Sequence, residues 1–144
     1  MMVGRVSFVP GLRRTPPLAF EERRAIRIRL DYEVGRARRY GGRVSVILFR
    51  APTGALDGNW QRFTATIPTS LRDLDSAWIE PDRITLVLPE TDVAARSHVV
   101  NRIVGNAERE GLVIGAWAST FPDEAPTSDA LLRSVTGTGG VSPR

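Results

Sequence analysis

The sequence predicts one α/β domain of the α+β type, with a ferredoxin-like βαββαβ order and an antiparallel hairpin at its centre. Four segments with the apolar character of strands lie at residues 43–50, 76–80, 83–88 and 112–120. Helical periodicity precedes the first segment and separates the first from the second and the third from the fourth. Pro81 and Asp82 place turn residues between the middle two segments, which makes them a hairpin. This order predicts a sheet with helices on one face.

The helix before the first strand is predicted at residues 18–40. Its apolar residues Ile26, Leu30, Val34 and Ala37 are spaced four, four and three positions apart, which puts them on one helical face. Most of the arginines in this range fall on the other faces. Two consecutive glycines then end the helix, because glycine readily adopts the left-handed conformation that follows many helices.

The second helix is predicted at residues 60–71, after a short loop, and Asn59 or Asp57 can cap its first turn. Pro68 lies inside this range, and proline lacks the N–H that a helix interior needs. The sequence therefore predicts a kink or an early end of this helix near the proline.

The third helix, residues 92–110, follows the buried strand that ends at Pro89, and Thr91 is its predicted N-cap. Its predicted core residues are Val99, Ile103, Val104 and Ala107. A glycine ends it. A last short helix precedes the C-terminus, with Ser128 or Thr127 as its predicted cap.

A chain of 144 residues, of which 42% are hydrophobic and 25% charged, is long enough to bury one core. We expect an N-terminal arm over residues 1–17, one domain over residues 18–135 and a flexible tail over residues 136–144. The chain has no cysteine and one histidine, which excludes disulfides, thiolate chemistry and a multi-histidine metal site. No apolar run reaches the roughly 20 residues of a membrane helix, and the N-terminus lacks a signal-peptide core, so a cytoplasmic location is expected.

Arginine supplies all 20 basic residues, and lysine is absent. This composition excludes lysine contacts to phosphate and Schiff-base chemistry. Residues 1–50 hold twelve arginines against four acidic residues, whereas residues 51–144 hold eight against twelve. The basic half is interpreted as a solvated helix, and an acidic partner is the alternative. Nucleic-acid binding is disfavoured, because the sequence contains no aromatic-interleaved basic patch and no nucleic-acid-binding motif.

Three segments resemble the GGDEF domain, the diguanylate cyclase module of bacterial signalling proteins. They are LDYEVGRARRYGGRVSVILF at residues 30–49, LRDLDSAWIEPDRITLVLPETDVAARSHVVNRI at residues 71–103 and LVIGAWASTFPDEAPTSDALLRSV at residues 112–135. The order and spacing of the RARRYG and LPET motifs carry the resemblance, which covers roughly residues 25–135. It implies the palm-like sheet of nucleotide cyclases and a role in cyclic di-GMP signalling.

The resemblance also implies a chemistry for which this sequence lacks residues. In that family, carboxylates hold Mg²⁺ against GTP, and one of them ends the first strand, where this sequence has Arg50 and Ala51. The degenerate signature turn consists of Glu80, Pro81, Asp82 and Arg83. The family has GGDEF there, so a proline replaces a flexible glycine and an arginine stands near the position of an acid. We therefore expect no catalytic residue, no metal site, no cofactor and no cyclase activity.

Arg72 and Asp75 match the Arg-x-x-Asp inhibitory site through which members of that family bind cyclic di-GMP. Five residues separate Asp75 from Pro81, as they do in the family. The resemblance implies that the arginine would contact a phosphate or the guanine edge, and that the aspartate would accept from guanine N–H groups. The alternative is structural: Arg72 stabilises a helix end beside its dipole, and Asp75 caps a turn.

The leading functional hypothesis is a catalytically inactive GGDEF-like signalling domain that acts through a protein partner or as a homodimer, with residues 18–40 available for pairing. The first alternative is a cyclic di-GMP receptor that uses Arg72 and Asp75. The second alternative is a residual diguanylate cyclase. His98 is expected at the surface, and no serine has the context of a nucleophile elbow, so a hydrolase is not supported.

Overall fold

The computed structural model describes residues 18–52 and 58–136. The predicted arm, the Asp57 cap and the rest of the predicted tail lie outside these ranges. The elements are α1 (Leu18–Tyr40), β1 (Val44–Arg50), α2 (Gly58–Ala65), the 3₁₀ helix η1 (Pro68–Ser70), β2 (Ser76–Ile79), β3 (Arg83–Pro89), α3 (Val93–Arg109), β4 (Gly115–Phe121) and α4 (Ser128–Thr136). Their kinds and order agree with the prediction. None of the described helices is long and apolar enough to cross a membrane.

The strands form one sheet in the order β2–β3–β1–β4, and every neighbouring pair is antiparallel. β1 is central, because Val46 lies opposite Val87 of β3 on one side and opposite Ser119 of β4 on the other. The predicted hairpin is confirmed, since β2 pairs with β3 directly across the turn that follows Ile79. This is the strand order of a ferredoxin-like sheet.

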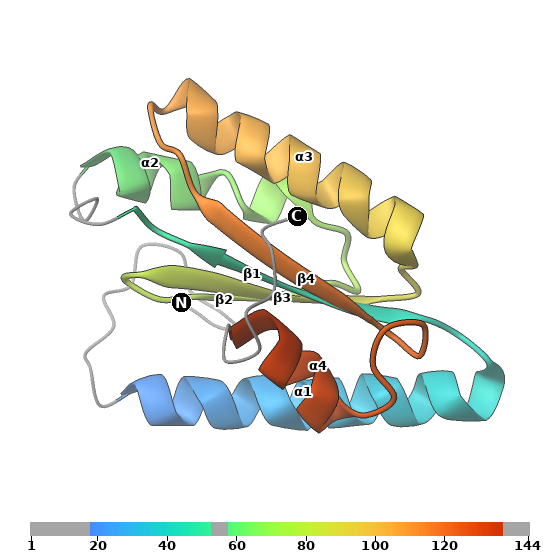
Figure 1. Ribbon diagram of the computed structural model, residues 1–144. Coiled ribbons are helices and arrows are strands. Elements are labelled where there is room, and N and C mark those ends of the chain that lie inside the picture. Colours follow the sequence, from blue (N-terminus) through green and yellow to red (C-terminus); the bar gives the residue numbers. More distant parts are fainter. Residues whose placement is uncertain (1–17, 53–57, 137–144) are drawn as a thin grey trace.

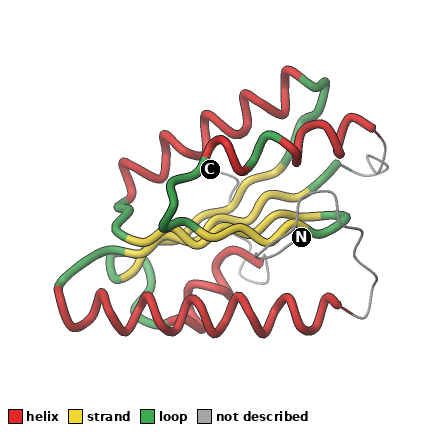
Figure 2. The backbone as a smooth tube through the Cα atoms, turned by 180° about the vertical axis from the view of Figure 1, so that it is seen from behind, coloured by secondary structure: helices red, strands yellow, loops and turns green. Residues whose placement is uncertain are grey.

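Helices cover both faces of the sheet. The two helices that connect strands, α2 and α3, lie together on one face, while α1 and α4 lie on the other (Figures 1 and 2). The prediction of helices on one face is therefore correct for the connecting helices and wrong for the whole domain. The reason lies in β1, where every residue from Val44 to Phe49 is buried. A strand that is buried on both sides needs a covering layer on each face.

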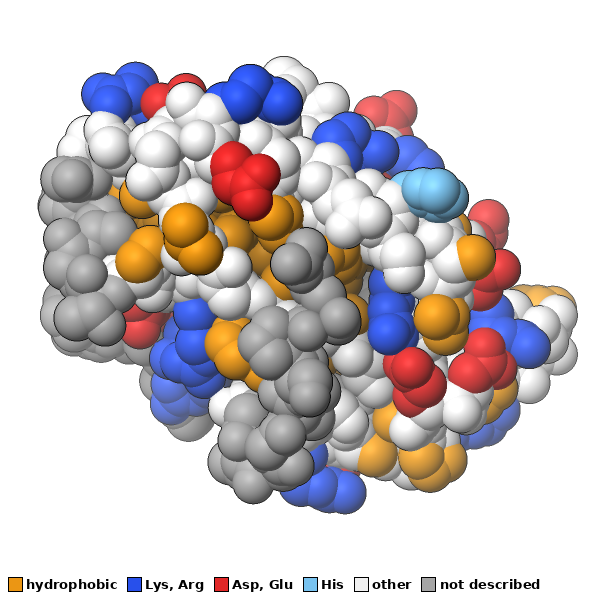
Figure 3. All heavy atoms as spheres, turned by 45° about the horizontal axis from the view of Figure 1, so that its top comes forward, with side chains coloured by type: hydrophobic (Ala, Val, Ile, Leu, Met, Phe, Trp, Pro, Cys, Tyr) orange, Lys and Arg blue, Asp and Glu red, His pale blue; other side chains and the backbone are white. Residues whose placement is uncertain are grey.

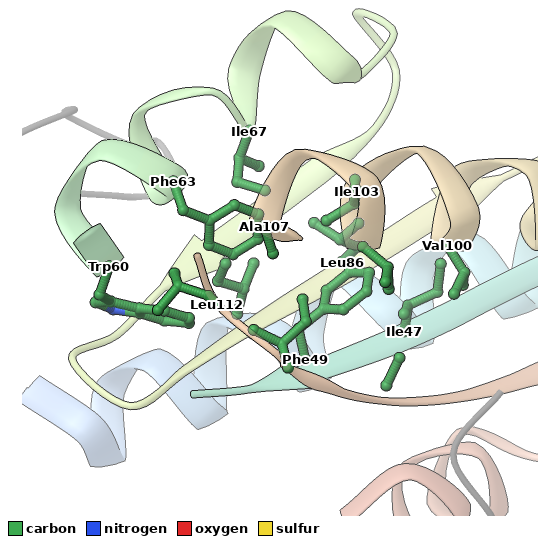
Figure 4. Packing of buried hydrophobic residues seen from close by; sticks show 14 of the residues in the cluster. Ile47, Phe49, Trp60, Phe63, Ile67, Leu86, Val100, Ile103, Ala107 and Leu112 are labelled. Carbon is green, nitrogen blue, oxygen red and sulfur yellow. The ribbon is translucent and has the colours of Figure 1, made fainter. Parts of the chain in front are cut away.

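Alternate side chains of β1 enter two separate cores. Ile47 and Phe49 join the core beneath α2 and α3, where the ring centroids of Trp60 and Phe63 lie 5.5 Å apart (Figure 4). The opposite core includes Ile26, Leu30, Val34, Val46, Leu48, Trp78, Val87 and Leu131. Because side chains alternate along a strand, the apolar run of β1 serves both cores at once.

The N-terminus of α3 is capped by Asp92 and not by the predicted Thr91. The Asp92 carboxylate accepts a hydrogen bond from the Ala95 N–H at 2.9 Å. Thr91 is buried instead, and its hydroxyl donates to the Pro89 carbonyl at 2.9 Å. Glu90, two residues before the cap, has a left-handed backbone conformation with a φ of 52°. The helix therefore starts one residue later than predicted.

The ends and buried faces of the other helices follow the sequence with two exceptions. The predicted Asn59 cap is wrong, because α2 starts at Gly58 and Asn59 lies inside the helix. α2 ends at Ala65, ahead of Pro68, which begins the 3₁₀ turn, so the early end is confirmed. Thr127 caps α4 by accepting from the Ala130 N–H at 3.1 Å. The buried face of α3 consists of Val100, Ile103, Val104 and Ala107. The prediction of Val99 is wrong, because its side chain is only half-buried.

Candidate functional site

The two segments in which the sequence departs from the GGDEF pattern lie side by side in the fold. Arg50, the last residue of β1, is the register partner of Arg83, the first residue of β3. The Ala51 N–H donates to the Asp82 carbonyl at 2.9 Å, which holds the end of β1 against the turn between β2 and β3. The end of β1 and the turn between β2 and β3 therefore form one end of the sheet.

Each of the two arginines at this end has a partner of its own. The Arg50 guanidinium donates to the Thr136 carbonyl at 3.1 Å and lies 5.8 Å from the ring centroid of Trp117, within the range of a cation–π contact. Arg83 pairs with the neighbouring Asp82, with 3.4 Å between its Nε and the carboxylate. Contacts within the fold thus hold both cations.

Glu80, at the start of the turn, has a strongly perturbed carboxyl group. Burial is the main cause that raises its pKa to about 7; Arg83 opposes the shift, and the carboxylates of Glu22 and Asp82 add to it. Glu22 comes from α1 and is itself buried. Sequence reasoning missed this neighbour, because no motif links α1 to a turn so distant in the chain. A carboxyl group with this pKa is about half protonated at neutral pH.

The chemistry available at this end of the sheet is limited by these charges. Mg²⁺ is held in proteins by ionised carboxylates together with substrate phosphates. The described residues contain no cluster of three or more His, Asp or Glu side chains that could hold a metal ion. The charged and titratable groups at this end include the partly protonated carboxyl group of Glu80 and the guanidinium groups of Arg50 and Arg83.

Arg72 and Asp75 bind each other. The Asp75 carboxylate accepts from the Arg72 backbone N–H at 2.8 Å and from its guanidinium at 2.8 and 3.2 Å. The Asp75 side chain is only 4% exposed. Its hydrogen bond is the main cause that raises the pKa of Arg72 above the ordinary value. This geometry matches the turn cap of the structural alternative.

The same guanidinium also connects the start of β2 to the end of β3. Its Nη2 donates to the Pro89 carbonyl at 2.7 Å and to the Thr91 hydroxyl at 2.8 Å. The Arg72 side chain nevertheless remains 48% exposed. A ligand at this position could contact Arg72 from the solvent side, whereas Asp75 could accept from a guanine only by releasing Arg72.

A hollow of about 480 Å³ lies at the opposite end of the sheet from the hairpin turn. It is lined by Glu33, Arg36, Ala37, Tyr40, Gly42, Arg43, Val44, Pro89 and Glu90. The Arg36 guanidinium lies 3.0 Å from the Glu90 carboxylate and 3.8 Å from that of Glu33, which is buried. Sequence reasoning missed the hollow, because its walls come from the end of α1 and from the ends of two different strands.

His98 and Ser45 bear on whether a hydrolase site is present. His98 is exposed on α3, as predicted (Figure 3). Ser45 is buried, and its hydroxyl lies 2.7 Å from both the Thr91 carbonyl and the Thr120 hydroxyl. Within the described ranges, neither residue belongs to an arrangement of serine, histidine and acid that a serine hydrolase would need.

No protein-family model and no curated protein sequence matches this chain. Solved structures do. The GGDEF domain of TpbB (YfiN) from Pseudomonas aeruginosa has a TM-score of 0.65 at 15% identity, over 79% of this chain and 78% of that chain. A sensory box/GGDEF family protein from Caulobacter crescentus has a TM-score of 0.65 at 16% identity, over 79% and 86%.

A third structure with the same fold is the diguanylate cyclase SiaD from Pseudomonas aeruginosa, solved in complex with its activator SiaC. It has a TM-score of 0.65 at 16% identity over 80% of this chain, and the match spans about half of SiaD, 52% of its length. The chain thus has the fold of the GGDEF domain, with its palm-like sheet, as the sequence motifs predicted. At identities this low, the likeness describes the fold and leaves the chemistry to the residues of this chain.

Proposed function

We propose that this chain is a catalytically inactive GGDEF-like signalling domain that acts through contacts with protein. The main support for the proposal is that Arg50 and Arg83 lie opposite each other on adjacent strands. Cations thus occupy the end of the sheet where a GTP-bound Mg²⁺ would need anions. Glu80, with a pKa of about 7, supplies only a partly ionised carboxylate in their place. The scaffold is retained, while the groups for phosphoryl transfer are replaced.

A protein partner is compatible with this fold, since SiaD was solved with a bound activator protein. For this chain, we propose that contact with a protein, either a different one or a second copy, is the retained function. Cyclic di-GMP signalling is the process in which such a domain would take part.

Incubation of the full chain with GTP and Mg²⁺ or Mn²⁺, followed by chromatography for cyclic di-GMP, tests the loss of catalysis. We expect no product under conditions in which an active diguanylate cyclase converts its substrate. Formation of cyclic di-GMP would overturn the proposal, and its loss in the Glu80→Gln variant would assign the activity to the half-buried carboxylate of the turn.

A receptor for cyclic di-GMP is the second candidate, and the exposed half of the Arg72 side chain favours it. Titration calorimetry with cyclic di-GMP distinguishes it from a purely protein-binding role. Heat that disappears in the Arg72→Ala variant would support the receptor. Absence of both heat and a thermal shift at high ligand concentration would remove it, since the Arg72–Asp75 pair would then be structural.

A further inference from the structure

Exposed apolar side chains gather on one side of α1. The large hydrophobic residues that are exposed in the described ranges are Ile28, Tyr32, Tyr40 and Val113. The first three belong to α1 and are 60%, 58% and 78% exposed. Together with Arg36 they follow one another at intervals of four, which places them in one row along the helix. We refer to Ile28, Tyr32, Arg36 and Tyr40 as the α1 ridge.

The ridge leads into the hollow at the end of α1. Arg36 and Tyr40 belong to both features, and Arg43 also lines the hollow. A volume of about 480 Å³ is in the range of small-ligand sites and is large enough for a bulky side chain. Tyrosine and arginine are also among the residues enriched at the energetic centres of protein interfaces. The ridge and the hollow therefore form one continuous surface, part convex and part concave.

Basic side chains outnumber acidic ones along α1, while charges of both signs line the hollow, where Arg36 pairs with Glu90. Residues 18–40 contain seven arginines and four acidic residues. Two of those acids, Glu22 and Glu33, are buried, so they contribute little negative charge to the outside. Arg24 and Arg39 are exposed close to the ridge. On the side of the molecule that carries α3, acidic and basic side chains are also mixed (Figure 3).

We propose that the α1 ridge docks an acidic protein segment, and that one large apolar side chain of this segment enters the hollow. The proposal rests on the protein-binding role proposed above and names its surface and the chemistry of the partner. Charge complementarity selects an acidic segment, whereas a second copy, with its own net charge of +4, would bring like charge to the contact. A flat lipid surface would leave the hollow unfilled.

Gly35 provides a way to test the charge of the partner. It lies three residues after Tyr32 and seven after Ile28, so it is on the same side of α1. A Cβ added there would meet nothing within 4 Å. Gly35→Glu and Gly35→Arg therefore add similar bulk and opposite charge beside the ridge, and neither should disturb the fold.

The experiment is selection of a displayed random-peptide library on the immobilised full chain, followed by affinity measurements on the enriched peptides. We expect these peptides to be acidic and to contain a large apolar residue. Tyr32→Ser should lower their affinity about tenfold or more, the usual effect of removing a central interface residue. Val113→Ser removes an even more exposed apolar side chain, outside α1, and should leave the affinity unchanged.

The two Gly35 variants then separate charge from bulk. Gly35→Glu should weaken binding of the acidic peptides, and Gly35→Arg should bind them more tightly than Gly35→Glu does. Equal effects of the two variants would overturn the acidic partner. So would enriched peptides that are neutral or basic, or peptides that bind Tyr32→Ser as well as they bind the unmodified chain.

Separate measurements test whether the ridge binds a second copy of the chain or a membrane instead. Self-association in sedimentation that is lost in Tyr32→Ser would assign the ridge to a second copy. Co-sedimentation with phosphatidylserine vesicles that is lost in the same variant would assign it to a membrane. Either result would overturn the proposal of a protein partner on this surface.

Failure of this inference is distinguishable from failure of the proposed function. A photo-crosslinking residue in place of Tyr32 or of Val113, expressed in cells, reports which surface meets a protein. Crosslinks from position 113 and none from position 32 would keep the protein-binding role and remove the ridge. Cyclic di-GMP synthesis by the chain would remove the inactive-domain proposal and leave the peptide selection to decide the ridge separately.

Discussion

Arg50 and Arg83 lie opposite each other where β1 ends and β3 begins. Like charges directly opposite on adjacent strands destabilise a sheet unless neighbouring groups take them up. Here Arg50 contacts Trp117 and the end of α4, while Arg83 pairs with Asp82. Because each cation has its own partner, their presence at this end of the sheet does not require a bound ligand.

Removal of either arginine should therefore have a small effect. Arg83→Ala should change the free energy of unfolding by less than about 1 kcal/mol, as expected for a partly exposed ion pair. Arg50→Ala should cost about 1–2 kcal/mol, since it loses the Trp117 contact and one hydrogen bond. Urea unfolding measures both values. A variant that keeps its stability but loses partner binding would show instead that the arginines form a ligand site.

Stability should depend on pH through Glu80. Its pKa is about 7 in the folded state, against an ordinary value of 4.5, so the folded protein holds a proton there that the unfolded chain releases. The contribution of the neutral carboxyl group is full below pH 4.5 and is lost as the pH rises to about 7, so stability should fall across this window. Chemical denaturation at several pH values measures this slope.

The Glu80→Gln variant should remove most of that slope, because glutamine stays neutral at every pH. It should also be more stable than the unmodified chain at pH 8, by about 1 kcal/mol after allowance for partial exposure. Glu108→Gln, at an exposed position on α3, is the matched control and should keep the slope. A slope that survives in Glu80→Gln would assign the pH dependence to another group.

The Arg72–Asp75 pair should be important for stability. Asp75→Ala should cost about 2–3 kcal/mol, since it removes a buried acceptor from one backbone N–H and one guanidinium. Asp75→Asn should cost less, because the amide oxygen can still cap the turn. Thermal unfolding of the two variants gives the comparison. Equal stability of all three proteins would favour the ligand-binding alternative for this pair.

Three glycines should respond differently to substitution by alanine. Gly35→Ala should stabilise the protein by about 0.5–1 kcal/mol, because the added methyl group meets nothing and alanine favours the helix. Gly111→Ala should destabilise it, since Gly111 has a φ of 80°. Gly115→Ala should cost about 1–3 kcal/mol, because its Cβ would lie 2.6 Å from the Trp117 ring. Calorimetric melting of the three variants should give opposite signs for Gly35 and the other two.

The sequence was sufficient for the kinds and order of the elements, because each depends on a local pattern. Periodic apolar residues marked α1, and Pro68 marked the early end of α2. The same patterns do not specify which face of the sheet each helix covers, so α1 and α4 were predicted as helices but not as a layer on the second face. The cap of α3 was misplaced by one residue, since the choice between Thr91 and Asp92 depends on the backbone turn at Glu90.

The sequence by itself determined that residues 80–83 read Glu-Pro-Asp-Arg and that arginine ends the first strand, because these are properties of single positions. Only the tertiary structure decided that Glu22 lies near Glu80 and that a hollow lies at the end of α1. It also decided that Arg72 donates hydrogen bonds to Asp75 and Pro89. These features join segments that are distant in the chain. The contacts between these segments form only after the sheet has brought them together.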